Sequence, residues 1–237
     1  MNTALSESRC KETERMNKMQ AVIFDMDGVI FDSENLVVKC WKVVAEKYGI
    51  EDVEAACKDC LGVNSIESKE RFLKKYGEEF PYDEYKSEMS ALYHQTAAAG
   101  GLDLKPGVVE LLTFLKEHKY GLAVASSTRR AVVESQLKNA KVLDFFDEII
   151  CGDMVKKSKP DPEIYLAAAE KMKVNPKECY AIEDSYNGIR SAYSAGMEAI
   201  MVPDLLLPTD ETREKCCVIC DSLLEVIEFI KTTDAIR

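Results

Sequence analysis

The chain has 237 residues, of which 46% are hydrophobic and 31% are charged. This composition excludes a disordered chain, a collagen-like fibre and a disulfide-framework miniprotein, and no apolar run approaches the roughly 18 residues of a membrane span. Acidic residues outnumber basic ones by 42 to 31, which gives a net charge of −11. We therefore expect no nucleic-acid partner, because a chain this acidic is repelled by phosphate backbones, and a phosphorylated ligand would require a local cation.

The first eighteen residues are polar and patternless, which predicts an N-terminal tail over residues 1–18. They contain no apolar segment typical of a secretory signal, so we expect a cytoplasmic protein with reduced thiols. Two Cys-x-x-Cys pairs, Cys57 with Cys60 and Cys217 with Cys220, raise the alternative of a zinc site. The first pair falls on an apolar helix face and the second in a short apolar strand, so we predict buried free cysteines instead.

The first element with a clear pattern is an apolar run over residues 21–24, which predicts a buried strand that ends at Asp25. From residue 34 to about residue 102 the hydrophobic spacing is helical, and no strand pattern interrupts it. Gly49 follows the first of these helices as its expected C-terminal cap. The apolar face that carries Trp41 predicts packing between this helical segment and the rest of the chain.

After Pro106 and Gly107, strands and helices alternate to the end of the chain. Strands are predicted over residues 122–126, 148–151, 179–182, 199–202 and 218–220, and a helix is expected to open with Asp161 as its N-cap and Pro162 as its first residue. This alternation predicts an α/β fold with a Rossmann-like parallel sheet flanked by helices. The core domain would comprise residues 19–33 and 104–237, and residues 34–103 would form a small all-helical cap domain inserted after the first strand.

Polar side chains follow several of the predicted strands at the point where each strand ends. They are Asp25 and Asp27 after the first strand, Ser126 at the end of the second, Lys159 after the third, and Glu183 and Asp184 after the fourth. Each alone has an ordinary explanation as a turn, cap or solvated residue, but parallel strands bring them all to one edge of the sheet.

Carboxylates gathered at one edge repel one another, so their pKa values must rise or a cation must lie among them. Oxygen ligands without histidine or thiolate favour Mg²⁺. A carboxylate also attacks phosphorus to form an aspartyl-phosphate, and a second carboxylate serves as general acid and then as general base. The pattern therefore indicates phosphoryl transfer.

Four segments, in this order, resemble the signatures of the haloacid dehalogenase-like phosphohydrolases. They are AVIFDMDGVIFDSE (21–34), LAVASST (122–128), SKPDPEIYLAAA (158–169) and AIEDSYNGIRSAYSAGM (181–197). The helical insert is similar to the small helical cap of that family, and the chain from about Met19 onward resembles its branch of β-phosphoglucomutases and small sugar-phosphate phosphatases.

The resemblance implies a role for each strand-end carboxylate. Asp25 would be the nucleophile, and Asp27 the general acid and base. Mg²⁺ would be held by Asp25, Asp184 and the backbone carbonyl of Asp27, with Glu183 as an inner or outer partner.

The resemblance also implies which groups bind the transferring phosphoryl group. Ser126 and Lys159 would contact its oxygens, and the backbone N–H groups of Met26 and Ser127 would assist as oxyanion donors do.

Two features distinguish a phosphatase from a phosphosugar mutase. Family mutases carry a histidine where Val37 stands and basic residues in the cap loop after the second helix, so the resemblance favours water as the acceptor. Asn64 and Ser65 of this loop would reach the leaving group. Arg129 and Arg130 would supply a second anion site from the core, which keeps a β-phosphoglucomutase-type mutase as the alternative, although a solvated helical turn is the simpler interpretation of both arginines.

The expected function is Mg²⁺-dependent hydrolysis of a small organic phosphate monoester through an aspartyl-phosphate. A non-enzymatic receiver-like phosphoacceptor domain is less favoured, because it has no helical insert of about seventy residues. His94 and His118 lie in no nucleophile–base pattern and are expected to be structural or solvated. A small phosphorylated metabolite is the expected partner, with no membrane partner, and a monomer is compatible with the sequence.

Overall fold

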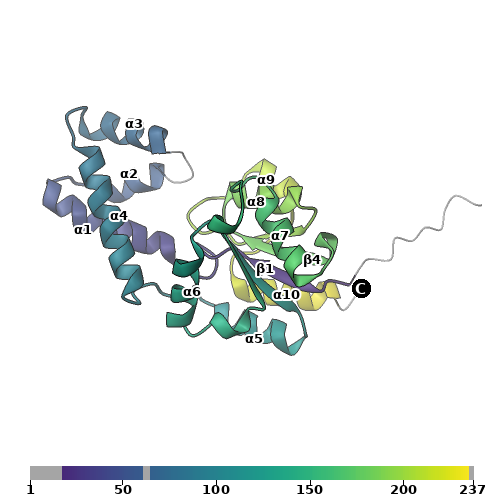
Figure 1. Cartoon of the computed structure of the whole chain (residues 1–237). Helices are drawn as coiled ribbons and strands as arrows, with labels where there is room; N and C mark the ends of the chain where they lie inside the picture. Colours follow the sequence, from purple (N-terminus) through teal and green to yellow (C-terminus); the bar gives the residue numbers. More distant parts are fainter. Residues whose placement is uncertain (1–17, 61–64, 235–237) are drawn as a thin grey trace, which may run out of the picture.

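The computed structural model describes residues 18–60 and 65–234, which form a parallel sheet and a separate lobe of helices (Figure 1). The strands are β1 (Ala21–Phe24), β2 (Gly121–Ser126), β3 (Glu148–Cys151), β4 (Cys179–Glu183), β5 (Glu198–Met201) and β6 (Cys216–Ile219). Neighbouring strands all pair in parallel, in the order β3-β2-β1-β4-β5-β6. The prediction of a Rossmann-like α/β fold is confirmed, and the strand order reverses between β1 and β4, where such sheets bind their ligands.

Helices cover both faces of the sheet, and the side chains of β1 alternate between the two helical layers. Val22 and Phe24 face one layer of helices and Ala21 and Ile23 face the other, because successive side chains of a strand point to opposite faces. The first layer contains α5 (Val108–Glu117), α6 (Arg130–Asn139) and α10 (Leu223–Asp234), and the second contains α7 (Glu163–Met172) and α8 (Tyr186–Ser194). Among the described helices, none is both long and apolar enough to cross a membrane.

The separate lobe is built from four helices that lie between β1 and β2 in the chain. They are α1 (Ser33–Tyr48), α2 (Val53–Asp59), α3 (Ser65–Tyr76) and α4 (Tyr82–Ala98). The ring of Phe72 lies 5.4 Å from that of Trp41 and 5.3 Å from that of Tyr85, and the Tyr85 hydroxyl donates to the carbonyl oxygen of Trp41 at 2.8 Å. Trp41 is thus packed inside this lobe by α4, and the prediction that it packs against the rest of the chain is wrong.

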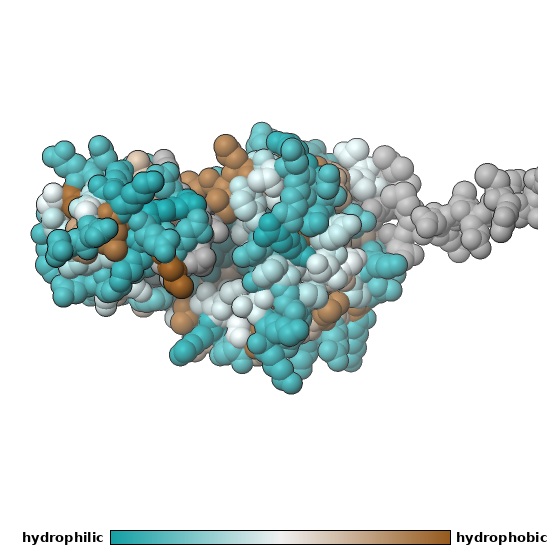
Figure 2. All heavy atoms as spheres, turned by 90° about the horizontal axis from the view of Figure 1, so that it is seen from above, coloured by the Kyte–Doolittle hydropathy of each residue, from teal (hydrophilic) through white to brown (hydrophobic). Residues whose placement is uncertain are grey.

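Two antiparallel chain segments connect the helical lobe to the sheet. Phe31 forms a bridge with Leu104, and the N–H of Asp32 donates to the carbonyl oxygen of Asp103 at 2.9 Å. Seen from above, the two lobes are separated by a hollow (Figure 2). Both segments lie just beyond the end of β1, so the helical lobe lies beside the carboxyl edge of the strands (Figure 1).

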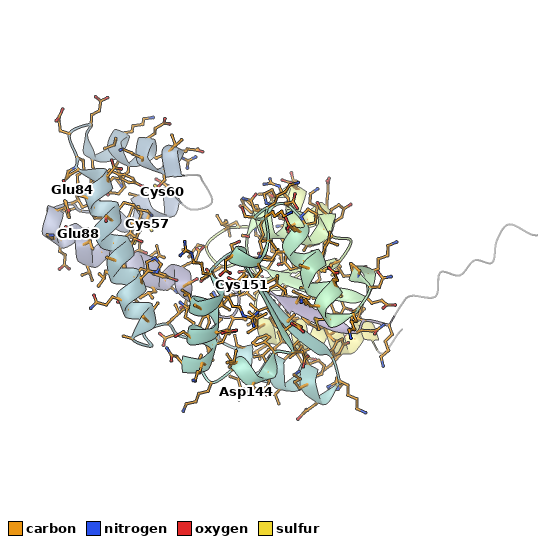
Figure 3. The ribbon with its side chains drawn as sticks, in the orientation of Figure 1. Cys57, Cys60, Glu84, Glu88, Asp144 and Cys151 are labelled. Atoms are coloured by element: carbon orange, nitrogen blue, oxygen red, sulfur yellow. The ribbon has the colours of Figure 1, made fainter. Side chains whose placement is uncertain are left out.

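The cysteines of the described residues are free thiols. Cys57 and Cys60 lie at the end of α2 in the helical lobe, whereas Cys151 lies in the sheet lobe (Figure 3). Cys57 and Cys220 are buried and Cys60 is half-buried. The prediction of burial is wrong for Cys217, which is exposed because β6 is an edge strand.

Two helix starts differ from the prediction. The helix α7 begins at Glu163, one residue later than expected, with Pro162 in the N-cap position. Asp161 still caps it, because its Oδ1 accepts the N–H of Glu163 at 3.1 Å. The short helix α9 (Asp210–Lys215) was not predicted, and a capping box of Thr209 and Thr212 begins it.

Candidate active site

The strand pairing of β1 with β4 brings three carboxylates together at the reversal of strand order. Phe24 pairs with Ile182, and the N–H of Asp25 donates to the carbonyl oxygen of Ile182 at 2.9 Å. Asp25, Glu183 and Asp184 each present a carboxylate oxygen, and these oxygens lie within 4.8 Å of one another. Among the described residues, no other group of His, Cys, Asp and Glu side chains converges in this way. An all-oxygen set of buried acids fits Mg²⁺.

Lys159 is the cation that the protein itself places among these acids. Its Nζ contacts the carboxylate of Asp25, lies 2.6 Å from Oε1 of Glu183 and donates to the carbonyl oxygen of Ala125 at 2.9 Å. Its side chain is only 7% exposed, so these groups replace the water that would otherwise solvate the ammonium. Removing one member of such a buried pair leaves an uncompensated charge.

Glu183 is fully buried and held at both carboxylate oxygens. The Tyr165 hydroxyl donates to Oε1 at 2.8 Å, and the Ser185 hydroxyl donates to Oε2 at 3.1 Å. Ser185 also caps α8 by accepting the N–H of Gly188 at 3.1 Å. A Cβ on Gly188 would lie 1.9 Å from Cδ of Glu183, so only glycine lets α8 approach this carboxylate.

The turn after β1 depends on a second close approach. Gly28 has a φ of +79°, and a Cβ at this position would lie 2.3 Å from Oδ2 of Asp184. Glycine is therefore required here both for the backbone conformation and for the space that Asp184 occupies.

Burial and mutual repulsion shift the pKa values of this cluster. Burial, Glu183 and Asp27 raise the pKa of Asp25 to about 8, although Lys159 opposes the shift. Burial, Glu183 and Asp25 also raise the pKa of Asp184 well above its usual range. Burial alone would lower the pKa of Lys159, but Asp25 and Glu183 more than offset it and the net shift is upward. The cluster thus holds excess protons that a divalent cation would displace.

We expect the metal-free protein to lose stability as pH rises from about 4 to about 8. In the folded state Asp25 keeps its proton until its raised pKa of about 8, whereas the unfolded chain releases it near 3.8. Since the folded state then binds more protons than the unfolded state, each rise in pH favours unfolding. Thermal unfolding in chelator and in Mg²⁺ measures this, and the Mg²⁺-induced rise in Tm should be larger at pH 8 than at pH 5.

Asp184→Asn should lose most of this Mg²⁺-induced rise in Tm. The exposed Asp144 lies at the lower edge of the sheet lobe in Figure 3, and Asp144→Asn should keep the rise. An equal rise at both pH values would contradict the assignment of these acids.

Asp27 is not one of the three converging acids, although its charge acts on Asp25. Its Oδ2 accepts the hydroxyl of Thr128 at 3.2 Å. Burial raises its pKa, and the hydrogen bond from Thr128, the charge of Lys159 and a hydrogen bond with Ser33 oppose that shift. Asp27 borders a cavity of about 350 Å³, the Asp27 cavity, whose lining residues come from both lobes: Asp27, Ser33, Glu34, Val37, Tyr93, His94, Thr128, Val132 and Gln136. A larger cavity of about 530 Å³ borders Gln20 and Tyr120, at the opposite end of β1 and β2, away from this chemistry.

The predicted phosphate-binding residues lie around the ends of β1 and β2. Ser126 is buried, and its Oγ accepts the N–H of Thr128 at 3.1 Å. Met26 is buried beside Asp25 and Ser127 is exposed. The structure thus places Ser126 and Lys159 within the strand-end site and leaves the Ser127 side chain facing solvent.

The remaining predicted residues are less closely tied to the site. Arg129 is exposed in the N-cap position of α6, and Arg130 forms a surface ion pair with Glu134 at 2.7 Å, which favours the solvated interpretation of this turn. Asn64 lies outside the described residues. Ser65 is the first residue of α3, and the structure describes its backbone only.

Comparison with known proteins assigns the family. The model of the haloacid dehalogenase-like hydrolases matches residues 22–202. The chain is 36% identical over 195 residues to a phosphorylated carbohydrates phosphatase of Thermotoga maritima, covering 77% of this chain and 84% of that protein. It is 35% identical over 192 residues to a β-phosphoglucomutase of Bacillus subtilis, covering 78% and 83%. The chain belongs to the haloacid dehalogenase-like hydrolases.

A solved structure of this family has the same arrangement of elements. The crystal structure of a putative β-phosphoglucomutase from Thermotoga maritima matches with a TM-score of 0.75 at 31% identity, covering 90% of this chain and 99% of the other. Haloacid dehalogenase-like hydrolases generally use Mg²⁺, and the cluster of Asp25, Glu183 and Asp184 provides the acidic oxygens that such an ion requires.

Sequence reasoning missed several residues of the Asp27 cavity. Glu34, Tyr93 and His94 line it from the helical segment, and Thr128 lines it from the loop after β2. His94 is exposed, as expected for a solvated histidine, but it faces this cavity. Thr128 could have been found from the sequence, because it lies two residues after Ser126 at the end of a predicted strand. Glu34, Tyr93 and His94 could not, because their place at the cavity depends on how the two lobes meet.

Proposed function

We propose that this hydrolase is a Mg²⁺-dependent phosphatase of small organic phosphate monoesters, with sugar phosphates as the favoured class. The observation that carries the proposal is the division of acids at the strand ends. Asp25 lies among Lys159, Glu183 and Asp184, whereas Asp27 is outside this group and borders a cavity, with the Thr128 hydroxyl as a partner. This division supports Asp25 as the nucleophile and Asp27 as the proton donor.

The reaction begins when a carboxylate oxygen of Asp25 attacks phosphorus. The bond between phosphorus and the leaving-group oxygen breaks, and Asp27 gives its proton to that oxygen. Asp27 then takes a proton from water, whose oxygen attacks the aspartyl-phosphate and releases inorganic phosphate and the free Asp25 carboxylate. Ser126 and Lys159 bind the phosphoryl oxygens during both steps.

Asp25, Asp184 and the carbonyl of Asp27 would hold Mg²⁺, with Glu183 as a further partner. When bound, the ion would offset the negative charge of these acids and of the phosphate and would keep Asp25 ionised. Glu183 itself is held in place by Tyr165 and Ser185.

The lining of the Asp27 cavity favours water over a second phosphorylated group as the acceptor. A mutase must hold a bisphosphate intermediate, which requires cationic partners for the second phosphate. Among the described residues that line the cavity there is no lysine or arginine, and Val37 stands at the position where mutases carry histidine. The β-phosphoglucomutase relative keeps the mutase as the second candidate.

The helical lobe is proposed to act as a cap that covers the substrate. The cap would comprise residues 34–103, and the core residues 19–33 and 104–237, with closure excluding bulk water. The partner would be a small phosphorylated metabolite in the cytoplasm.

Phosphate release tests the proposal. The protein should release phosphate continuously from p-nitrophenyl phosphate with Mg²⁺ and stop when the ion is chelated. A panel of phosphorylated metabolites then ranks the substrates. A receiver-like domain would take phosphate only once, from acetyl phosphate. Robust conversion of β-glucose 1-phosphate to glucose 6-phosphate would favour the mutase instead.

A further inference from the structure

Thr128 contacts two residues that the proposed reaction uses for different purposes. Its hydroxyl donates to Oδ2 of Asp27 at 3.2 Å, and its N–H donates to Oγ of Ser126 at 3.1 Å. Its side chain also lines the Asp27 cavity. A single residue therefore connects the proton donor to the end of β2, where the phosphoryl group would bind.

The backbone around Thr128 is held by the chain that follows β3. The N–H of Gly152 donates to the carbonyl oxygen of Thr128 at 3.1 Å. A Cβ on Gly152 would lie 2.1 Å from the carbonyl oxygen of Ser127, so the two segments are in direct contact. Because the main chain is fixed on both sides, the hydroxyl of Thr128 has few positions to occupy.

We propose that Thr128 is a positioning residue that holds the Asp27 carboxyl group toward the cavity. Thr128 binds Oδ2 of Asp27, and Ser33 is a second hydrogen-bond partner of this carboxyl group, whereas Lys159 binds Asp25 and Glu183. The inference rests on the proposed function, because it concerns the proton that Asp27 gives to the leaving-group oxygen.

A threonine hydroxyl suits a group that changes protonation state. It has one hydrogen to donate and two lone pairs to accept. By rotating about its Cβ–Oγ bond it donates to ionised Asp27 and accepts from protonated Asp27. The same contact therefore orients the carboxyl group before and after the proton moves, which a cation such as lysine does not do.

The choice of leaving group separates this role from a structural one. The leaving oxygen of a sugar phosphate departs as a strongly basic alkoxide and needs a proton, whereas nitrophenolate leaves without one. Loss of a positioned general acid therefore slows the sugar phosphate more than the nitrophenyl ester. Damage to the fold or to the phosphate site slows both alike.

The experiment measures kcat/KM of the full chain with Mg²⁺ on p-nitrophenyl phosphate and on the sugar phosphate that the wild type cleaves fastest. Thr128→Val should lower kcat/KM for the sugar phosphate on the order of 10-fold more than for the nitrophenyl ester. Thr128→Ser keeps the hydroxyl and should restore the wild-type ratio. Asp27→Asn provides the reference, with a larger change in the same direction.

An equal loss on both esters, or a serine variant that fails to restore the ratio, would overturn the proposal. Thr128→Ala replaces the valine variant if circular dichroism shows that valine disturbs the fold, and the same criteria apply to it. If the wild type hydrolyses neither ester, the proposed function fails and this inference with it. If the wild type hydrolyses both esters but Thr128→Val has the same ratio of kcat/KM values as the wild type, the positioning role of Thr128 is rejected and the proposed function stands.

Discussion

Asp25→Asn is expected to abolish turnover of phosphate monoesters, with a fall in kcat of about 10³-fold or more. Asparagine has nearly the size of aspartate, but its neutral amide is not a nucleophile toward phosphorus. The variant also loses one carboxylate of the cluster with Glu183 and Asp184. Continuous phosphate release with Mg²⁺ measures the effect, and acid quenching should trap a phosphoenzyme from the wild type and none from the variant.

The loss should be chemical rather than structural. Lys159 keeps Glu183 as its partner at 2.6 Å, so no buried charge loses all its partners when Asp25 becomes neutral. We therefore expect the Tm of Asp25→Asn in chelator to be no lower than that of the wild type, because the raised pKa of Asp25 means that the fold favours the neutral group. The exposed Asp144→Asn is the matched control and should turn over normally. A wild-type rate in Asp25→Asn would reject Asp25 as the nucleophile.

The strand-end site could be predicted because parallel pairing is a strong constraint. Apolar runs that end in Asp25, Ser126 and Glu183 are visible in one dimension, and a parallel sheet places all such ends on one edge. The convergence of Asp25 and Glu183 follows from this rule together with the adjacency of β1 and β4. Periodicity alone does not give that adjacency, because it carries no strand order.

The features that sequence reasoning missed all depend on which element covers which face. The apolar face of α1 shows that Trp41 is buried, but α4 of the same lobe covers it and not the sheet. The apolar character of residues 216–220 indicates a strand, but its place at the edge of the sheet leaves Cys217 exposed. The contact between Thr128 and Asp27 joins residues 101 positions apart, which no local pattern contains.

Gly188→Ala is expected to destabilise the protein by more than about 2 kcal/mol and to weaken Mg²⁺ binding about 10–100-fold. Gly188 lies inside α8, where helix propensity alone predicts that alanine stabilises by about 1 kcal/mol. The steric conflict destabilises the fold by more than this gain, because the new methyl group would lie 1.9 Å from Cδ of Glu183. Urea unfolding and calorimetric titration with Mg²⁺ measure the two effects.

Two further variants separate the steric conflict from a backbone effect. Gly196 follows the same helix with a φ of +80° and open space where a Cβ would lie, so Gly196→Ala should cost only about 1–2 kcal/mol and keep Mg²⁺ binding. Adding Glu183→Asp to Gly188→Ala shortens the displaced side chain by one methylene and should recover part of the lost stability. A Gly188→Ala variant as stable as the wild type would mean that the carboxylate of Glu183 is free to move, although Tyr165, Ser185 and Lys159 all contact it. The position of Glu183 determines where the acidic cluster converges. The Mg²⁺ affinity of Gly188→Ala therefore measures how closely α8 must approach β4 for the cluster to bind the ion.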